Sequence, residues 1–271
     1  MIIGIDIGST TTKAVSLESG RVVKRIKTKA IDAVTSAAGA FGKLMLENGI
    51  KMPEIRKIMI TGAGATKIEG ALFGIPTEKV SEIEAIGTGG MFLSGEDNII
   101  IANIGTGTAI IEARKEKITH LGGSGVGGGT ILGLAKKLIS ISDFKDLMEL
   151  AESGNLEPVD LLLEDIMETD LSFLNKKSTA SNFGKMLDTA RNEDIALGVI
   201  NLVYQVIGML AVFAARSRNI NRVIVTGSGS HNPLGQKILT DITALHSIAF
   251  EYPEYAEYTT AVGAGLFGLK A

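Results

Sequence analysis

The chain has 271 residues, a formal net charge of −3 at pH 7 and no cysteine. This length suits one large domain or two closely packed ones, and the 45% share of hydrophobic residues supplies a sizeable core. The lack of cysteine excludes disulfides, thiolate metal sites, cysteine-ligated iron–sulfur clusters and cysteine nucleophiles. No cluster of Lys and Arg stands out, so we expect no nucleic-acid partner.

The first residues, MIIGIDIGSTTTK, have neither a positively charged start nor a small-residue cleavage site, so we expect no signal peptide and a cytoplasmic protein. Residues 195–215 carry no charge and are long enough to span a bilayer. However, Asn201, Gln205 and Gly208 recur there at helical spacing. This polar and small-residue stripe favours a buried core helix over a membrane span.

The first half of the chain alternates short strands and helices up to a break at residues 94–97. We assign these elements from the period of their apolar residues and from the Gly-rich turns between them. The expected elements are a strand meander over 1–28, a helix over 33–48, a strand over 55–61, and short helices over 66–73 and 83–93.

The second half follows a similar order. The expected elements are two strands joined by a Gly-Thr turn over 98–111, a strand over 117–121, helices over 131–138, 144–152, 158–168 and 195–215, a strand over 222–226, and a last helix from about Thr260.

The two halves also open with similar sequences. IIGIDIGSTT from Ile2 aligns with IIIANIGTGT from Ile99, 97 positions later, which places Asp6 on Asn103 and Ser9 on Thr106. Internal repetition decides the architecture of a chain, and this offset is close to the length of one domain. We therefore expect a duplicated α/β fold whose halves, residues 1–97 and 98–271, flank a cleft.

Small residues form the turn between the first two strands of each copy. A tight turn of Gly, Ser and Thr brings backbone N–H groups and hydroxyls close to a phosphate oxygen. Two such turns that face each other would hold one triphosphate from both sides. The residues concerned are Gly8, Ser9, Thr10 and Thr11 in the first copy, and Gly105, Thr106, Gly107 and Thr108 in the second.

Asp6 and Lys13 flank the first of these turns. A lone carboxylate among apolar residues is costly unless it faces a cation or a cleft. Mg²⁺ binds through few protein ligands and several waters when phosphates are near, so we expect Asp6 to position Mg²⁺ through water. Lys13 is placed to reach the same phosphates as a point charge, although on its own it would be read as a solvated lysine.

Two further glycine-rich segments follow predicted strands. Gly227, Ser228, Gly229 and Ser230 form a strand exit against which a nucleoside can lie. The run with Gly122, Gly123, Gly125, Gly127 and Gly128 leads into a helix whose N-terminus can receive an anion. This run is neither a Walker A loop, since no Gly-Lys-Ser/Thr follows, nor a Rossmann turn, since no acidic residue ends a second strand.

Glu82 and Glu84 close the first half in the sequence SEIEA. Phosphoryl transfer to an alcohol needs a carboxylate that orients the hydroxyl and accepts its proton. On a strand the two carboxylates would share a side, whereas at a helix start they would be acids favoured by the helix dipole. The residues alone leave these two interpretations open. His120, His231 and His246 form no metal-ligand spacing.

Together these motifs resemble the superfamily of acetate and sugar kinases, Hsp70 and actin, and within it the type II pantothenate kinases. The resemblance covers nearly the whole chain, and implies an actin-like ATPase (ribonuclease H-like) fold whose final helix returns towards the first half. It further implies ATP-dependent phosphorylation of pantothenate, the first step towards coenzyme A, by a homodimer. Its motifs are GIDIGSTTTK, ANIGTGT (102–108), the glycine run 122–134, TASNFG (179–184) and GSGSHN (227–232).

By position, the resemblance implies that Glu82 is the general base and that Thr106 and His120 contact the acceptor. Type II pantothenate kinases have an arginine where this chain has His120, and histidine cannot make a bidentate contact with a carboxylate. Either Arg114 or another cation compensates, or the acceptor is a neutral analogue such as pantetheine.

The opening GIDIGSTTTKAV is also similar to the ATPase activators of 2-hydroxyacyl-CoA dehydratases, which couple ATP hydrolysis to electron transfer through a cysteine-ligated cluster. This chain has no cysteine to bind such a cluster. The alternative to a kinase is therefore a cluster-free, ATP-dependent regulator of a partner protein.

Overall fold

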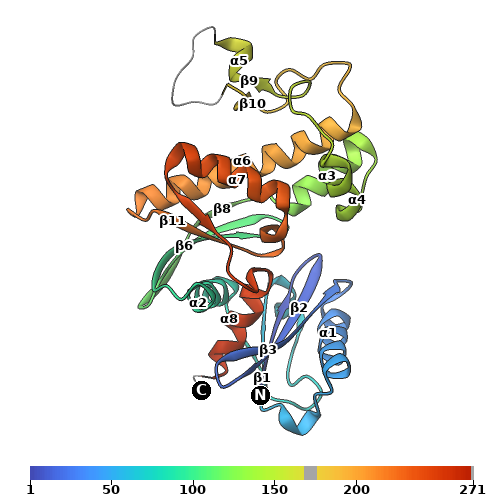
Figure 1. Cartoon of the computed structure of the whole chain (residues 1–271). Coiled ribbons are helices and arrows are strands. Elements are labelled where there is room, and N and C mark those ends of the chain that lie inside the picture. Colours follow the sequence, from blue (N-terminus) through green and yellow to red (C-terminus); the bar gives the residue numbers. More distant parts are fainter. Residues whose placement is uncertain (168–175, 270–271) are drawn as a thin grey trace.

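The computed structural model describes residues 1–167 and 176–269. These form two lobes arranged one above the other, with both chain ends at the free end of the first lobe (Figure 1).

The first lobe is built on a five-stranded sheet in the order β3-β2-β1-β4-β5. The first three strands in the chain are antiparallel, and β1, β4 and β5 are parallel. Its strands are β1 (Ile2–Ile7), β2 (Thr11–Glu18), β3 (Arg21–Lys29), β4 (Lys57–Thr61) and β5 (Thr77–Lys79), with the 3₁₀ turns η1 (Met52–Glu54) and η2 (Ala63–Lys67).

Helix α1 (Ala33–Asn48) covers one face of this sheet, with the bounds that the sequence predicts. The Asp32 carboxylate accepts a hydrogen bond from the Thr35 amide at its start, and Gly49 ends it with φ 66°. Its buried Phe41 and Leu44 pack with isoleucines of β1 and β4.

The second lobe repeats the first sheet strand for strand. Its order is β12-β11-β6-β7-β8, with β6, β7 and β8 antiparallel and β6, β11 and β12 parallel. The strands are β6 (Asn98–Ile104), β7 (Thr108–Arg114), β8 (Lys117–Ser124), β11 (Arg222–Thr226) and β12 (Ala249–Glu251). The duplicated α/β fold expected from the sequence repeat is thereby confirmed.

One face of the second sheet carries the largest core of the molecule, to which four helices contribute. They are α3 (Gly128–Ile139), α4 (Phe144–Ala151), α6 (Asn192–Ser217) and α7 (Pro233–His246). By length and composition α6 could cross a membrane, yet 61% of its most apolar window is buried inside the protein. It is a core helix, as its polar stripe predicts.

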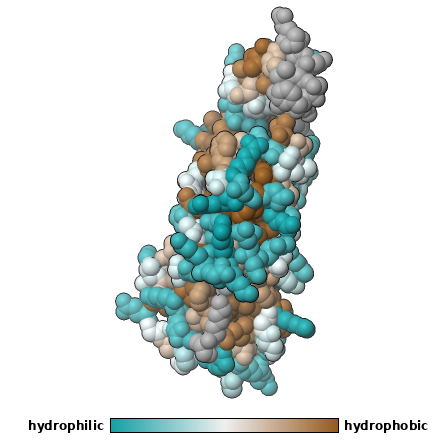
Figure 2. Space-filling model, turned by 90° about the vertical axis from the view of Figure 1, so that its left-hand side faces the viewer, coloured by the Kyte–Doolittle hydropathy of each residue, from teal (hydrophilic) through white to brown (hydrophobic). Residues whose placement is uncertain are grey.

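Hydrophilic side chains cover much of the middle of the face seen in Figure 2.

Two helices pass between the lobes. Helix α2 (Glu82–Ser94) follows the first sheet in the chain but packs on the second, where Ile86 joins Ile99 and Ile101. Helix α8 (Thr259–Phe267) ends the second half but packs on the first sheet, where Ala261 joins Ile2 and Leu17. The two helices also pack closely on each other, since a Cβ at Gly263 would collide with the Ala85 carbonyl oxygen. Figure 1 shows them between the sheets.

Two expected helices are wrong. In place of a helix over 66–73, the 3₁₀ turn η2 ends at Lys67, and positive φ angles at Gly70, Phe73 and Gly74 make the segment irregular. Residues 158–167 form a two-residue strand, β9 (Leu161–Leu162), and a single turn, α5 (Leu163–Ile166); Glu168 lies outside the described residues. The reason is Asp160, whose buried carboxylate accepts hydrogen bonds from the Phe183 amide and Thr179 beside β10 (Thr179–Ser181).

Candidate active site

The two small-residue turns meet where the lobes adjoin. Ser9 lies between β1 and β2, Thr106 lies between β6 and β7, and their hydroxyl oxygens are 2.7 Å apart. These two residues are equivalent in the sequence repeat, so their contact lies at the pseudo-twofold axis that relates the lobes. The structure thus brings together the two turns that the sequence analysis selects. After their predicted ligand, we call residues 8–11 the first phosphate turn and residues 105–108 the second phosphate turn.

Backbone amides surround this contact. The Gly8 amide donates to the Thr11 carbonyl at 3.1 Å and the Gly105 amide to the Gly107 carbonyl at 2.8 Å, which closes each turn. In the described part of the chain, the amides of four turn residues donate to no protein acceptor; these are Ser9, Thr10, Thr106 and Gly107. A row of unpaired amides and hydroxyls is the donor set that a phosphate chain requires.

Asp6 and Lys13 lie side by side at the base of the first turn. They are register partners across the β1–β2 pair, and Lys13 is only 5% exposed. Burial raises the pKa of Asp6 to about 6, although the Lys13 charge opposes the rise and the Glu82 charge adds to it. Burial also lowers the pKa of Lys13, while Asp6 and Glu257 oppose that shift. This pair supplies an anionic and a cationic group at the edge of the phosphate turns.

Glu82 is the first residue of α2, so the helix-start interpretation of its local structure is correct and the strand interpretation is wrong. Its side chain reaches the surface, but the protein around it is dense enough to raise its pKa by desolvation. Glu84 lies two positions further along the helix and therefore projects in another direction. The Glu82 charge contributes to the raised pKa of Asp6.

The Gly227–Ser230 turn follows β11 and lies beside the second phosphate turn. A Cβ at Gly227 would lie 2.5 Å from the Ile104 carbonyl oxygen, and the φ of +81° at Gly227 favours glycine. The Tyr204 hydroxyl of α6 donates to the Gly229 carbonyl at 2.7 Å. Helix α6 thereby fixes the turn that the sequence predicts to hold adenosine.

The glycine run at the end of β8 supports the second phosphate turn through several of its amides. The Gly128 and Gly129 amides donate to the carbonyls of Gly105 and Thr106, both at 2.9 Å. The Gly127 amide donates to the Thr130 hydroxyl at 3.2 Å. The start of α3 therefore has these three amides engaged, and its role as an anion site stays a prediction.

The glycines earlier in this run serve close packing. A Cβ at Gly123 would lie 2.5 Å from the Thr108 carbonyl oxygen, and Gly122 has φ +149° at the irregular pairing of β7 with β8. Gly125 has open space around it. The run is small because β7, β8 and the second phosphate turn approach one another closely.

His120 is exposed on β8, opposite Ile111 and on the sheet face that α2 covers. It therefore lies on the same side of the second sheet as α2, the helix that begins with Glu82. Arg114, in contrast, ends β7 six residues beyond Thr108, about 20 Å from the phosphate turn. Arg114 forms an ion pair with Glu112 at 2.6 Å. It cannot take the place of the arginine that His120 replaces.

Sequence reasoning missed one element of the site, the turn Thr61–Ala65 after β4. It is the first-lobe counterpart of Thr226–Ser230: Gly62 and Gly227 have φ angles of +87° and +81°, and a 3₁₀ turn follows each. The signal was present as Thr-Gly-Ala-Gly-Ala against Thr-Gly-Ser-Gly-Ser. Asp6 lies against this turn, since a Cβ at Gly62 would be 2.6 Å from its Oδ1.

The donor set suits Mg²⁺ bound together with phosphates. Among the described residues, no group of three or more His, Cys, Asp or Glu side chains could hold a metal on its own. Asp6 therefore offers one carboxylate, and phosphate oxygens and water would complete the shell, which is the coordination that Mg²⁺ prefers.

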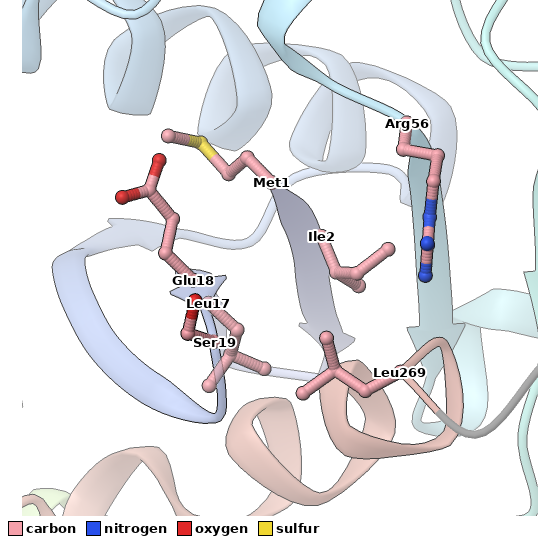
Figure 3. A pocket seen from close by; sticks show the side chains of 7 residues that line it. All are labelled: Met1, Ile2, Leu17, Glu18, Ser19, Arg56 and Leu269. Carbon is pink, nitrogen blue, oxygen red and sulfur yellow. The ribbon is translucent and has the colours of Figure 1, made fainter.

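A separate hollow of about 340 Å³ lies at the opposite end of the first lobe. It is lined by Met1, Ile2, Leu17, Glu18, Ser19, Arg56 and Leu269 (Figure 3). Ile2 begins β1, whereas the phosphate turn follows its last residue. This hollow is therefore not part of the candidate active site.

Two lobes of the same α/β fold, with phosphate turns facing each other beside a carboxylate and a lysine, define an ATP-binding protein of the actin-like class. Solved structures agree on the fold. The activator of the 2-hydroxyisocaproyl-CoA dehydratase from Clostridium difficile with bound ADPNP has a TM-score of 0.69 at 20% identity, over 99% of this chain and 94% of that one. A ROK family glucokinase from Streptomyces griseus in complex with glucose and AMPPNP has a TM-score of 0.62 at 14% identity, over 100% and 99%.

Sequence comparison identifies the family. The Fumble family model matches residues 96–266. The type II pantothenate kinase of Bacillus cereus is 34% identical over 272 residues, which covers 95% of this chain and 91% of that protein. The type II pantothenate kinase of Staphylococcus aureus is 31% identical over 280 residues, covering 99% and 100%. The chain belongs to the Fumble family, and the resemblance to type II pantothenate kinases is confirmed.

Proposed function

We propose that this protein transfers the terminal phosphoryl group of ATP to the hydroxyl of pantothenate, giving 4'-phosphopantothenate in the first step of coenzyme A biosynthesis. The observation that carries the proposal is the Ser9–Thr106 contact at 2.7 Å, ringed by unpaired amides and placed beside Asp6 and Glu82. The relatives named type II pantothenate kinase support pantothenate as the acceptor.

The two turns bind the phosphate chain. On binding, the hydroxyls of Ser9 and Thr106 exchange their mutual hydrogen bond for bonds to phosphate oxygens. The free amides of the same turns add donors from both lobes, and Lys13 adds a positive charge. Donors fixed in this way stabilise charge on the transferred group because they need no reorganisation when the reaction occurs.

Glu82 and Asp6 have separate roles, at the acceptor hydroxyl and at the metal. Glu82 orients the acceptor hydroxyl and accepts its proton, and its raised pKa brings it nearer to the working pH than an ordinary glutamate. Asp6 would hold Mg²⁺ through water. Bound Mg²⁺ supplies charge neutralisation at the phosphate oxygens. The adenosine is proposed to lie against the Gly227–Ser230 turn.

The acceptor experiment measures ADP release by the purified protein with Mg·ATP alone, then with pantothenate, then with pantetheine. We expect release that depends on pantothenate, which requires His120 or another cation near it to serve the carboxylate. ADP release with pantetheine but not with pantothenate would show that the acceptor is a neutral analogue. Equal release in all three mixtures would overturn the kinase and favour an ATP-driven regulator.

We further propose that the protein acts as a cytoplasmic homodimer that pairs through α6. Val206, Leu210 and Phe213 are 36%, 36% and 59% exposed at helical spacing on this otherwise buried helix. Light scattering of the purified protein tests this: a mass of about twice 28.5 kDa is expected.

A further inference from the structure

Thr61, the last residue of β4, carries a buried hydroxyl at the junction of the lobes. The residue is 0% exposed, and its Oγ1 has no hydrogen-bond partner among the described residues. Buried hydroxyls are normally paired because an unpaired one loses its bonds to water without replacement. The position of this hydroxyl therefore needs a physical explanation.

Asp6 is the neighbour of Thr61 across the sheet. Asp6 and Thr61 are register partners across the parallel β1–β4 pair, so their side chains leave the same face of the sheet on strands about 4.8 Å apart. Asp6 Oδ1 lies against the start of the next turn, since a Cβ at Gly62 would be 2.6 Å away. The carboxylate is thus held next to the end of β4, within reach of the Thr61 hydroxyl after a side-chain rotation.

The second lobe contains the same pair in the hydrogen-bonded form. Thr226 is the register partner of Asn103 across the β6–β11 pair, and its Oγ1 donates to Asn103 Oδ1 at 2.9 Å. Asn103 Oδ1 also lies against the next turn, 2.9 Å from a Cβ at Gly227. The two lobes therefore place a threonine, an acceptor oxygen and a glycine in one arrangement, and they differ in whether the threonine hydroxyl is paired.

We propose that Thr61 is a positioning residue for Asp6, whose carboxylate accepts the Thr61 hydroxyl in the metal- and nucleotide-bound protein as Asn103 accepts that of Thr226. The proposal rests on the proposed function in one respect, since it takes Asp6 as the group that holds Mg²⁺. The hydrogen bond fixes one carboxylate oxygen and leaves the other for the water shell of the metal. The proposed bond calls for a rotation of the Thr61 side chain between staggered positions.

The test compares three variants with the wild type. Thr61→Val removes the hydroxyl and keeps the shape, and Thr61→Ser keeps the hydroxyl. Thr12→Val is the matched control, because Thr12 is also 0% exposed with an unpaired Oγ1, but pairs with Ile7 on the sheet face that α1 covers. Circular dichroism melts establish that each variant is folded.

The readout is Mn²⁺ binding to the full-length protein with ADP, followed by electron paramagnetic resonance and without any acceptor. We expect Thr61→Val to weaken Mn²⁺ binding about tenfold or more, since hydrogen bonds to charged groups are the strong ones. Thr61→Ser should restore binding to within about threefold of the wild type, and Thr12→Val should leave it unchanged. Unchanged binding in folded Thr61→Val would overturn the proposal, as would equal losses in Thr61→Val and Thr12→Val.

This experiment separates the inference from the proposed acceptor. If the wild type binds Mn²⁺ with ADP and the variants behave as expected, the role of Thr61 holds even when pantothenate is not phosphorylated. If the wild type binds no Mn²⁺ with ADP, the assignment of Asp6 and the role of Thr61 both fail.

Discussion

At the scale of single residues, the two lobes differ most where Asp6 faces Asn103. Both residues are in register with a threonine at the end of the neighbouring parallel strand, but only Asp6 carries charge. The cross-strand partner of Asp6 is Lys13, whereas the cross-strand partner of Asn103 is Ala109. The duplication has therefore kept the phosphate turns in both lobes and a charged pair in the first alone.

The raised pKa of Asp6 makes the stability of the nucleotide-free protein depend on pH. Its pKa is raised from 3.8 to about 6 on folding, so its favourable contribution is complete below pH 3.8 and is lost as the pH rises through 6. The difference between the two pKa values corresponds to roughly 3 kcal/mol of folding free energy. We therefore expect Asp6→Asn to be more stable than the wild type by up to about 3 kcal/mol at pH 7.5, and similar to it near pH 4.

Urea unfolding of both proteins at these pH values measures this difference. Asp188→Asn, at an exposed position, is the control and should follow the wild type throughout. A stability difference between Asp6→Asn and wild type that does not change with pH would contradict the burial of an ionised Asp6.

Substitutions of the two acidic residues at the start of α2 should have different kinetic effects. Glu82→Gln should lower kcat by about 10²–10⁴-fold, because the group that accepts the hydroxyl proton is lost, with little change in the KM for ATP. Glu84→Gln removes an acid from the same helical turn but from another side of the helix. Near-normal kcat in the Glu82 variant, or equal losses in both, would show that the base lies elsewhere.

At the scale of elements, the sequence predicts best where local signals agree. Asp32 and Gly49 mark the two ends of α1, and apolar spacing fills the interval, so its bounds are correct. The segment 158–167 shows the opposite case. Its spacing predicts a helix, but the buried carboxylate of Asp160 is satisfied by groups more than 15 residues away in the chain. Long-range hydrogen bonds of this kind leave no periodic signal.

The contact between α2 and α8 depends on glycine. A Cβ at Gly263 would collide with the Ala85 carbonyl oxygen, and backbone cannot rotate aside as a side chain can. Gly263→Ala should therefore lower the free energy of unfolding by about 3 kcal/mol, the upper part of the range for overpacking.

Gly42→Ala is the matched control, since Gly42 lies within α1 with nothing within 4 Å of its Cβ position. Alanine is the better helix former, so this variant should gain about 0.5–1 kcal/mol. Denaturant unfolding measures both changes, and a stable Gly263→Ala protein would mean that the helices separate more easily than their contact indicates.

At the scale of the whole molecule, the repeat predicts the architecture and the meeting of Ser9 with Thr106, because equivalent turns of a duplicated fold come together at the pseudo-twofold axis. It does not predict which amides are already engaged. The Gly128 and Gly129 amides look available in the sequence, yet they donate to carbonyls of the second phosphate turn. Which donors remain free depends on how β7, β8 and α3 pack, and the glycine pattern does not contain that information.

Because α2 packs on the second sheet and α8 on the first, we expect the two lobes to unfold together. Each sheet has one face covered by a helix from the other half of the chain, with Ile2 and Leu17 against α8 and Ile99 and Ile101 against α2. Loss of either lobe therefore exposes the apolar face of the other. Native-state hydrogen exchange should report the same free energy of opening for amides of β1 and β6, equal to that of global unfolding. A β1 that opens at clearly lower free energy than β6 would show that the first lobe unfolds separately, with α8 leaving it while the larger core of the second lobe stays intact.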